Sequence, residues 1–442
     1  MRKRMLALLL AFVMAVGLLP TAAGAADAPS GVPAAGAHGP RAEHAGWTEW
    51  TDAGALPSSA GQYYLNTDVT LSSYWQPPNG VTLCLNGHVV RTTAYYPVIY
   101  VNSGVTLDIC DCMDYDATDV RHKFSEAPDV PGLWTLDEAG GTKILRGGVI
   151  TGGRNGNTAG GGGVQIMGGT LNLYGGNIAG NRTSTNGGGG GVYVGSGAFY
   201  MYGGAIAGNV ARMTNTGNLG TGGGVSVAGG ASFTMRGRAV AERTYGPNIH
   251  DNTAQAGGGV YNLGVVTMTK ENRDCSPPYV QKNTAAYDGA AGSGYGGGVW
   301  TGTGSELTVE MGSVVGDNTG GNTALYGGGI FNNGTLTLQT GGCVSCNTAA
   351  GQGGGVYGYG VIHLTGEVII NNNTVNGGKN NLYLPDGKAV SAALSEYAWV
   401  YVTTEAAPTE GTPVNITGAN EAGSHQRLLQ RRGLAGGGQR RS

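Results

Sequence analysis

The sequence predicts an all-β protein built as a coil of stacked short strands. A Gly-Gly-Gly-(Val/Ile) motif occurs seven times between residues 160 and 360, at intervals of 26 to 39 residues. Each copy runs into a short segment in which apolar and polar residues alternate. Each copy then ends on a β-branched residue three positions before an asparagine. Repeats of this length are typical of solenoids, in which a copy buries its apolar face only against its neighbours.

The alternating segments predict the strands. Examples are TLNLY at 170–174, VVTMT at 265–269 and TLTLQ at 335–339. Alternation with a period of two over four or five residues is typical of a strand with one buried face, and the repeats show no helical period. If each turn of the coil lies about 4.8 Å from the next, equivalent residues form ladders along the axis.

This stacking explains two positions of the repeat. We expect the glycines at a corner where a Cβ atom would clash between turns. We expect the asparagines at another corner, because Asn tolerates left-handed backbone and can hydrogen-bond to the next turn. The expected members of this asparagine ladder are Asn181, Asn209, Asn252, Asn283, Asn318, Asn347 and Asn372, with Asn373 as the alternative to Asn372.

The composition agrees with a folded coil. Glycine accounts for 86 of 442 residues, 40 % of the residues are hydrophobic and only 12 % are charged. The glycines lack the strict period of collagen, and the hydrophobic content is too high for a disordered chain. The net charge of −3 gives no electrostatic basis for binding nucleic acid, so we expect no such partner.

The first residues indicate export. Arg2, Lys3 and Arg4 precede an apolar run over 5–19, and small residues with an Ala-x-Ala-like cleavage site follow. This pattern predicts a signal peptide at 1–26. The run is short for a membrane anchor and no second run follows, so we expect a secreted or cell-surface protein without a transmembrane segment after cleavage.

On these residues the chain resembles the right-handed parallel β-helix repeat proteins of the pectate-lyase-like superfamily. It is similar to the Gly-rich repeats of polymorphic membrane proteins and of exported surface proteins of Gram-positive bacteria. The resemblance implies a right-handed parallel β-helix with short three-strand turns and variable loops, and we expect a monomer. The expected ranges are a linker at 27–59, the β-helix at 60–385 with its Gly-rich repeats at 150–385, closing strands at 386–418 and a disordered basic tail at 419–442.

An aromatic stripe is the main candidate for a binding site. The residue after the branched position is aromatic in four successive copies, at Tyr261, Trp300, Phe331 and Tyr357. Because the Val or Ile points inward, alternation makes these rings point outward in a row along the coil. Two interpretations are open: the rings stack on each other and stabilise the ladder, or they bind sugar rings.

The repeats contain few acids, which disfavours catalysis. Lyases of this fold use carboxylates that bind calcium together with a base, and hydrolases use a pair of carboxylates. We therefore expect a surface protein that functions in adhesion, binding a polysaccharide or a host surface molecule without catalysis. The alternatives are a polysaccharide lyase or glycoside hydrolase, and a structural stalk of a larger surface protein.

One acidic segment, DCMDYDATD at 111–119, is a candidate calcium site. Its possible ligands are Asp111, Asp114, Asp116 and Asp119. The alternative is a solvated loop without metal, and no other cofactor is expected. Six cysteines in an exported chain permit disulfides, but the sequence does not define their state, and the Cys343-x-x-Cys346 pair is interpreted as structural.

Overall fold

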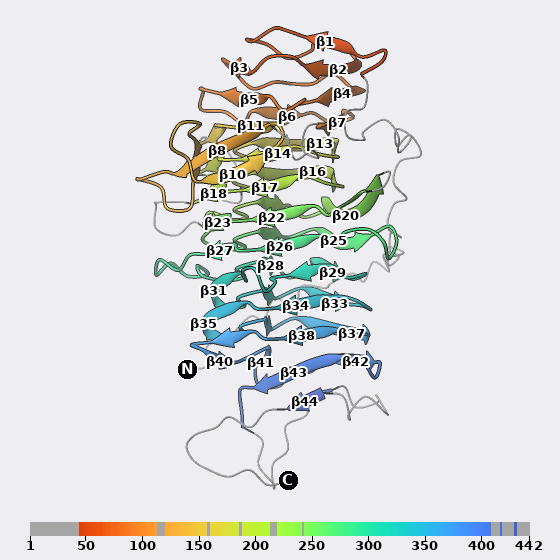
Figure 1. The fold of residues 1–442 in the computed structure, drawn as a ribbon. Helices are drawn as coiled ribbons and strands as arrows, with labels where there is room; N and C mark the ends of the chain where they lie inside the picture. Colours follow the sequence, from red (N-terminus) through yellow and green to blue (C-terminus); the bar gives the residue numbers. More distant parts are fainter. Residues whose placement is uncertain are drawn as a thin grey trace, which may run out of the picture.

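The chain forms a long stack of coil turns, with the strands of each turn lying above those of the next (Figure 1). The computed structural model describes residues 44–112, 120–156, 160–184, 188–212, 219–240, 243–407, 416–417 and 428–430. These residues form strands, turns and bends, and none of them is in a helix. The predicted all-β fold and its parallel β-helix architecture are therefore confirmed.

Each full turn visits four stacks of strands, which we name A to D in chain order. Stack A holds β6 (Ile99–Val101), the first half of β13 (Val164–Leu173), the first half of β16 (Val192–Met201), β19 (Val225–Val227), β24 (Val260–Asn262), β28 (Val299–Thr301), β32 (Ile330–Asn332), β36 (Val356–Gly358) and β41 (Leu382–Leu384). Stack B holds β1 (Thr48–Trp50), β2 (Gly61–Leu65), β4 (Val81–Cys84), β7 (Thr106–Cys110), the second halves of β13 and β16, β20 (Ser232–Val240), β25 (Val265–Lys270), β29 (Glu306–Val309), β33 (Thr335–Leu338), β37 (Val361–Gly366) and β42 (Ser391–Leu394).

Stacks C and D complete the turn. Stack C holds β3 (Val69–Leu71), β5 (Val89–Thr92), β11 (Val149–Thr151), β14 (Asn177–Ala179), β17 (Ala205–Ala207), β22 (Asn248–His250), β26 (Tyr279–Gln281), β30 (Val314–Val315), β34 (Cys343–Ser345), β38 (Ile369–Asn371), β43 (Trp399–Thr404) and β44 (Leu428–Gln430). Stack D holds β12 (Arg154–Asn155), β15 (Arg182–Thr183), β18 (Val210–Ala211), β23 (Thr253–Ala254), β27 (Thr284–Ala285), β31 (Thr323–Tyr326), β35 (Thr348–Gln352), β39 (Thr374–Val375) and β40 (Gly378–Lys379). The pairings within the stacks are parallel except that of β39 with β40, and the short stack D is a fourth strand position beyond the three expected.

Among the described residues, four strands lie outside the stacks. Residues between β7 and β11 form an antiparallel sheet of β8 (Arg121–Glu126), β9 (Trp134–Leu136) and β10 (Lys143–Arg146). A second insertion adds β21 (Arg243–Tyr245), which pairs with the end of β20. Both are excursions from single turns of the coil, which continues on either side of them.

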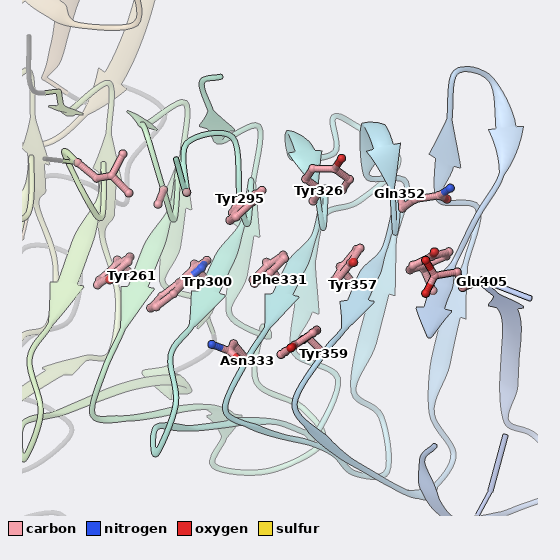
Figure 2. Close-up of a pocket in the computed structure, with 14 residues that line it drawn as sticks. Tyr261, Tyr295, Trp300, Tyr326, Phe331, Asn333, Gln352, Tyr357, Tyr359 and Glu405 are labelled. Atoms are coloured by element: carbon pink, nitrogen blue, oxygen red, sulfur yellow. The ribbon is translucent and has the colours of Figure 1, made fainter. Parts of the chain in front are cut away.

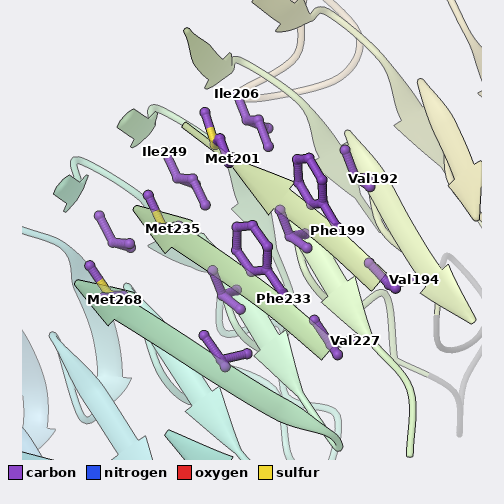
Figure 3. Packing of buried hydrophobic residues seen from close by; sticks show 14 of the residues in the cluster. Val192, Val194, Phe199, Met201, Ile206, Val227, Phe233, Met235, Ile249 and Met268 are labelled. Atoms are coloured by element: carbon purple, nitrogen blue, oxygen red, sulfur yellow. The ribbon is translucent and has the colours of Figure 1, made fainter. Parts of the chain in front are cut away.

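Inward-pointing apolar side chains form the core as ladders along the axis. Phe199 and Phe233 occupy paired positions in stack B, and their rings stack with centroids 4.8 Å apart and planes 10° apart (Figure 3). Met201 and Met235 form the next pair in the same strands, and all four side chains are buried. A buried side chain of this size contributes about 1.5–3 kcal/mol. Each such ladder of buried side chains therefore stabilises the stacking of the turns.

The asparagine ladder is a continuous chain of buried amide hydrogen bonds. Asn252, for example, accepts at Oδ1 from the backbone N and the Nδ2 of Asn209, and its own Nδ2 donates to the Oδ1 of Asn283 at 3.0 Å and to the Ile206 carbonyl at 2.8 Å. Such amide pairs link, in order, Asn181, Asn209, Asn252, Asn283, Asn322, Asn347, Asn373 and Asn381. None of these asparagines has a positive φ; the left-handed residue is often the one before, as at Asp251 and Lys282. Asn is therefore used for its hydrogen bonds and not for its backbone freedom.

Two expected members of the ladder are wrong. Asn318 is exposed, because Asp317 and Gly320 close a tight four-residue turn that delays the ladder position to Asn322. Asn372 is also exposed and has φ 55°. The inward residue of β38 is Ile370, the partner of Val344, so the residue three positions later, Asn373, joins the ladder.

The middle glycine of each motif lies where no side chain fits. An ideal Cβ on Gly258 would be 2.5 Å from the Gly297 carbonyl oxygen of the next turn and 2.5 Å from the carbonyl carbon of Thr284. The third glycine, Gly259, would place its Cβ 2.9 Å from Nδ2 of Asn283. The glycine corner and the asparagine ladder are thus in contact, and the predicted steric role of the glycines is confirmed.

The ends of the coil differ from the expected ranges. β1 lies within the range assigned to the linker, and it pairs with β2. β44 lies within the range assigned to the tail, and it pairs with β43. The predicted signal peptide lies outside the described residues.

Candidate functional site

The predicted aromatic stripe lies along stack A, and it is one residue longer than expected. Tyr261, Trp300, Phe331 and Tyr357 are partners of one another in successive turns, and Tyr383 of β41 extends the row. The four predicted rings are half-buried. Five turns spaced by about 4.8 Å give the stripe a length of about 19 Å.

A second row, which the sequence analysis missed, runs beside the stripe. It consists of Tyr295, Tyr326 and Gln352, which are also partners in successive turns. Each of them directly precedes a glycine triplet, whereas the four predicted stripe residues each follow a triplet by two positions. The recurrent Tyr-Gly-Gly-Gly-(Val/Ile)-aromatic pattern at 295–300 and 326–331 was the signal that could have found this row.

The two rows line a groove of about 680 Å³. In Figure 2 the stripe runs between the second row on one side and Asn333 and Tyr359 on the other. Eight of the fourteen residues that line the groove are aromatic. Glu405 is the only charged side chain among these described lining residues.

The rings of the stripe are paired and not evenly stacked. Tyr261 and Trp300 stack with centroids 4.2 Å apart. Phe331 and Tyr357 stack at 5.1 Å, and the other neighbour of Phe331 is Tyr295 of the second row, at 4.7 Å and 6°. The first interpretation of the stripe, stacking that stabilises the ladder, therefore describes these contacts.

Within the second row, the ring of Tyr326 makes edge-to-face contacts with two neighbouring rings. The ring of Tyr326 is at 63° to that of Tyr295 and at 70° to that of Tyr357, both in edge-to-face contacts. Edge-to-face and offset-stacked pairs are the arrangements that aromatic quadrupoles favour. The groove wall is thus a network of contacting aromatic rings that spans several turns.

Three tyrosines of the groove, Tyr261, Tyr357 and Tyr383, have a raised pKa and keep their hydroxyl protons at neutral pH. Burial raises the pKa of Tyr261 and of Tyr357 above the usual range. Burial, together with the negative charge of Glu405, raises the pKa of Tyr383 to about 12. A protonated phenol both donates and accepts a hydrogen bond, so the groove combines apolar ring surface with polar tips.

The four candidate calcium ligands do not form a site among the described residues. Asp111 is 2 % exposed, and its carboxylate accepts hydrogen bonds from the backbone N–H groups of Gly87 and Gly148. Asp114, Asp116 and Asp119 lie outside the described residues. Asp111 therefore serves as a backbone acceptor within the coil, and calcium binding by this segment stays a prediction.

All six cysteines are described, and none of them forms a disulfide. Cys343 and Cys346 belong to stack C and the turn that follows it, and they are half-buried. No metal-ligand cluster among the described residues includes either of them.

The fold and the groove define a parallel β-helix with an aromatic groove along one face. Comparison with protein-family models, with curated proteins and with solved structures finds no match for this chain. Within the described part of the chain, no helix has the length and hydropathy to cross a membrane.

Proposed function

We propose that this protein is an exported bacterial surface β-helix that binds an uncharged polysaccharide in its aromatic groove, without catalysis, as an adhesin does. The observation that carries the proposal is the lining of the groove, in which eight aromatic residues accompany a single charge. A sugar chain presents apolar ring faces and hydroxyl groups side by side. Tyrosine side chains offer matching apolar ring surface and hydroxyls.

The length and direction of the groove support a linear ligand. Its rings come from successive turns, so it follows the coil axis for about 19 Å. A groove of this length holds several sugar units of a chain and is long for a single monosaccharide. The rings around Phe331 and Tyr326 contact one another without a ligand, and a groove wall that is already assembled lowers the entropy cost of association.

The stacking within the stripe decides which groups meet the ligand. Tyr261 and Trp300 cover one face of each other, as do Phe331 and Tyr357. Those paired rings therefore contribute their outward edges and hydroxyls. The remaining polar contacts come from Tyr326, Gln352 and Asn333, which lie beside the stripe.

Catalysis is not part of the proposed function, because the described residues of the groove lining include no second acid. A glycoside hydrolase of the usual kind needs two carboxyl groups that flank the scissile bond. Glu405 is the only carboxylate among the described residues of the lining. A lyase would need a base and a cation site close to it, and the groove offers neither among these residues.

The test is a binding assay that separates lost contacts from lost stability. The purified chain is incubated with insoluble neutral polysaccharides, and soluble fragments of those retained are titrated calorimetrically. Tyr326→Phe and Tyr357→Phe keep the rings and remove only the hydroxyls. We expect each to weaken binding at least about fivefold, since one hydrogen bond is worth about 1 kcal/mol, with little change in melting temperature. Tyr397→Phe is the control, because Tyr397 is 65 % exposed and lies outside the groove.

The same samples distinguish the alternatives. Release of reducing ends or of unsaturated products would show an enzyme and would overturn the non-catalytic part of the proposal. A chain that retains no polysaccharide would contradict glycan binding and leave the stalk as the better explanation. Retention of charged polysaccharides alone would contradict an uncharged ligand.

A further inference from the structure

A cluster of cysteines and a histidine lies on the outer face of the first turns, far along the chain from the groove residues. Cys84 ends β4 and Cys110 ends β7, and the two residues are register partners in stack B. Val81, Leu83, Leu107 and Ile109 of the same strands belong to the hydrophobic core. By alternation Cys84 and Cys110 point outward, where Cys112 and His44 join them.

Three of these side chains place their potential ligand atoms close to one another. Sγ of Cys84 is 3.7 Å from Sγ of Cys112, and Sγ of Cys112 is 3.8 Å from Nε2 of His44. All three atoms lie within 4.8 Å of one another. In a tetrahedral zinc site with Zn–S of about 2.3 Å and Zn–N of about 2.1 Å, the S···S edge is about 3.8 Å and the S···N edge about 3.6 Å. The two distances 3.7 Å and 3.8 Å match the corresponding edges of such a tetrahedron, and the third separation, between Cys84 Sγ and His44 Nε2, is at most 4.8 Å.

The surroundings hold the ligands in place. The imidazole of His44 stacks on the ring of Tyr64, with centroids 4.2 Å apart and planes 4° apart. Cys84, Cys110 and Cys112 are buried in an apolar cluster that includes Tyr174. A buried site of this kind excludes competing water and fixes the orientation of its ligands, as structural metal sites require.

We infer that this cluster is a structural metal site for zinc or a similar thiophilic ion, with His44 Nε2, Cys84 Sγ and Cys112 Sγ as ligands. Cys110, the register partner of Cys84, lies outside this group of three, and its thiol donates to the Leu83 carbonyl oxygen at 3.8 Å; we assign it as the fourth ligand, a position that its side chain reaches by a change of rotamer. Thiolate and imidazole donors select zinc and other soft or borderline ions over calcium and magnesium. Each thiol gives up its proton to solvent when the metal binds.

The site would fasten the start of the coil. His44 lies just before β1, whereas the cysteines belong to the turns of β4 and β7. The metal therefore joins the segment that leads into the coil to two later turns. Terminal turns of a solenoid lack a neighbour on one side and need such a closure.

The competing interpretation is a disulfide between Cys84 and Cys112, whose sulfur atoms are close. A disulfide would use two of the four side chains and would leave His44 and Cys110 without a role. The two interpretations predict different behaviour of the purified chain. A chelator removes the ion from a metal site, and a mild reductant leaves that site unchanged. A disulfide is unaffected by a chelator and is cleaved by a reductant.

The experiment measures zinc in the full chain, purified with a mild reductant and dialysed against micromolar zinc and then against buffer. We expect one zinc per chain by elemental analysis, and a chelator should lower the melting temperature. Zinc should also slow alkylation of Cys84, Cys110 and Cys112, read by peptide mass mapping, relative to Cys275, which is buried outside the cluster. This protection is measured on the unmodified chain, so it does not depend on whether a variant folds.

Variants then identify the ligands. Loss of an outer-shell partner costs about 10–100-fold in metal affinity, so His44→Ala and Cys84→Ser should each lose at least about 100-fold. Cys275→Ser, the matched control, should keep the full stoichiometry. Absence of retained zinc, unchanged affinity in His44→Ala, or a Cys84–Cys112 disulfide in the chain purified without reductant would each overturn the metal site. Full zinc occupancy in Cys110→Ser would overturn only the assignment of the fourth ligand.

Discussion

Tyr261 and Trp300 lie face to face, with ring centroids 4.2 Å apart and planes 1° apart, although 39 residues separate them in the chain. The contact exists because the two residues occupy the same position in successive turns, where β24 pairs with β28. A row of half-buried rings on the outer face of a β-helix therefore stabilises the stack as well as lining a groove. The two interpretations of the stripe are compatible, since a ring can stack with one side and present its edge with another.

Trp300→Leu tests whether the stacked pair of Tyr261 and Trp300 stabilises the coil. Leucine keeps an apolar side chain at the position but removes the ring that stacks on Tyr261, and aromatic pairs are worth about 0.5–1.5 kcal/mol beyond their buried area. We expect a loss of at least about 0.5 kcal/mol in the free energy of unfolding, measured by urea titration. Tyr397→Leu, at an exposed tyrosine outside the groove, should change it by less than about 0.5 kcal/mol. Equal losses in the two variants would contradict a structural role for the stacked pair.

Two nearby asparagines, Asn322 in the ladder and Asn318 outside it, should contribute very differently to the free energy of unfolding. Asn322→Ala removes the acceptor of the Asn283 backbone N and Nδ2 and the donor to the Val280 carbonyl, all of them buried. An unsatisfied buried polar group costs about 1–3 kcal/mol, so we expect a loss of about 2 kcal/mol or more. Asn318→Ala, four residues earlier and exposed, should be within about 0.5 kcal/mol of the natural chain. The opposite order of stabilities would restore Asn318 to the ladder.

The ladder also shows how far the sequence could predict this fold. Inward Val and Ile, the glycine triplets and most ladder asparagines were predictable because every turn imposes the same constraint on them. Asn318 was misassigned because spacing from Val315 cannot reveal that residues 317–320 turn back on themselves. Asn372 was misassigned because adjacent isoleucines at 369 and 370 leave the inward phase of the strand ambiguous.

The candidate site was predicted only in part for a similar reason. The stripe follows from strand alternation, which is a local property of the chain. The second row depends on how stack D meets stack A across the glycine triplet, so Tyr295 and Tyr326 approach Phe331 and Tyr357 only in the folded coil. The metal cluster depends on a contact between His44 and Cys112, 68 residues apart, with no spacing motif to indicate it.

Gly258→Ala tests the corner assignment. The added methyl group would lie 2.5 Å from the carbonyl oxygen of Gly297, a backbone atom held by the pairing of the next turn, so the strands must move apart. Overpacking of this kind costs about 1–3 kcal/mol. Gly229→Ala is the matched control, because Gly229 is exposed, has no positive φ, and its Cβ would meet only the Leu263 carbonyl oxygen at 3.8 Å. We expect the control to be neutral or slightly stabilising, since alanine restricts the unfolded chain.

The stability of the coil should fall in alkaline solution, in part through Tyr383. Its pKa is raised from 10.0 to about 12 by burial and by the negative charge of Glu405. Below pH 10 both the folded and the unfolded chain keep this proton, and the contribution of the buried neutral phenol is complete. Between pH 10 and about 12 the unfolded chain releases the proton while the folded chain retains it, so the free energy of unfolding decreases as the pH rises.

Tyr383→Phe cannot ionise at this position and should therefore show a smaller decrease in the free energy of unfolding over this range, measured by urea titration at a series of pH values. Other tyrosines with a raised pKa, such as the half-buried Tyr261 and Tyr357, keep part of the slope in that variant. An identical slope in Tyr383→Phe and in the natural chain would show that the phenol of Tyr383 ionises equally well in the folded and unfolded chains.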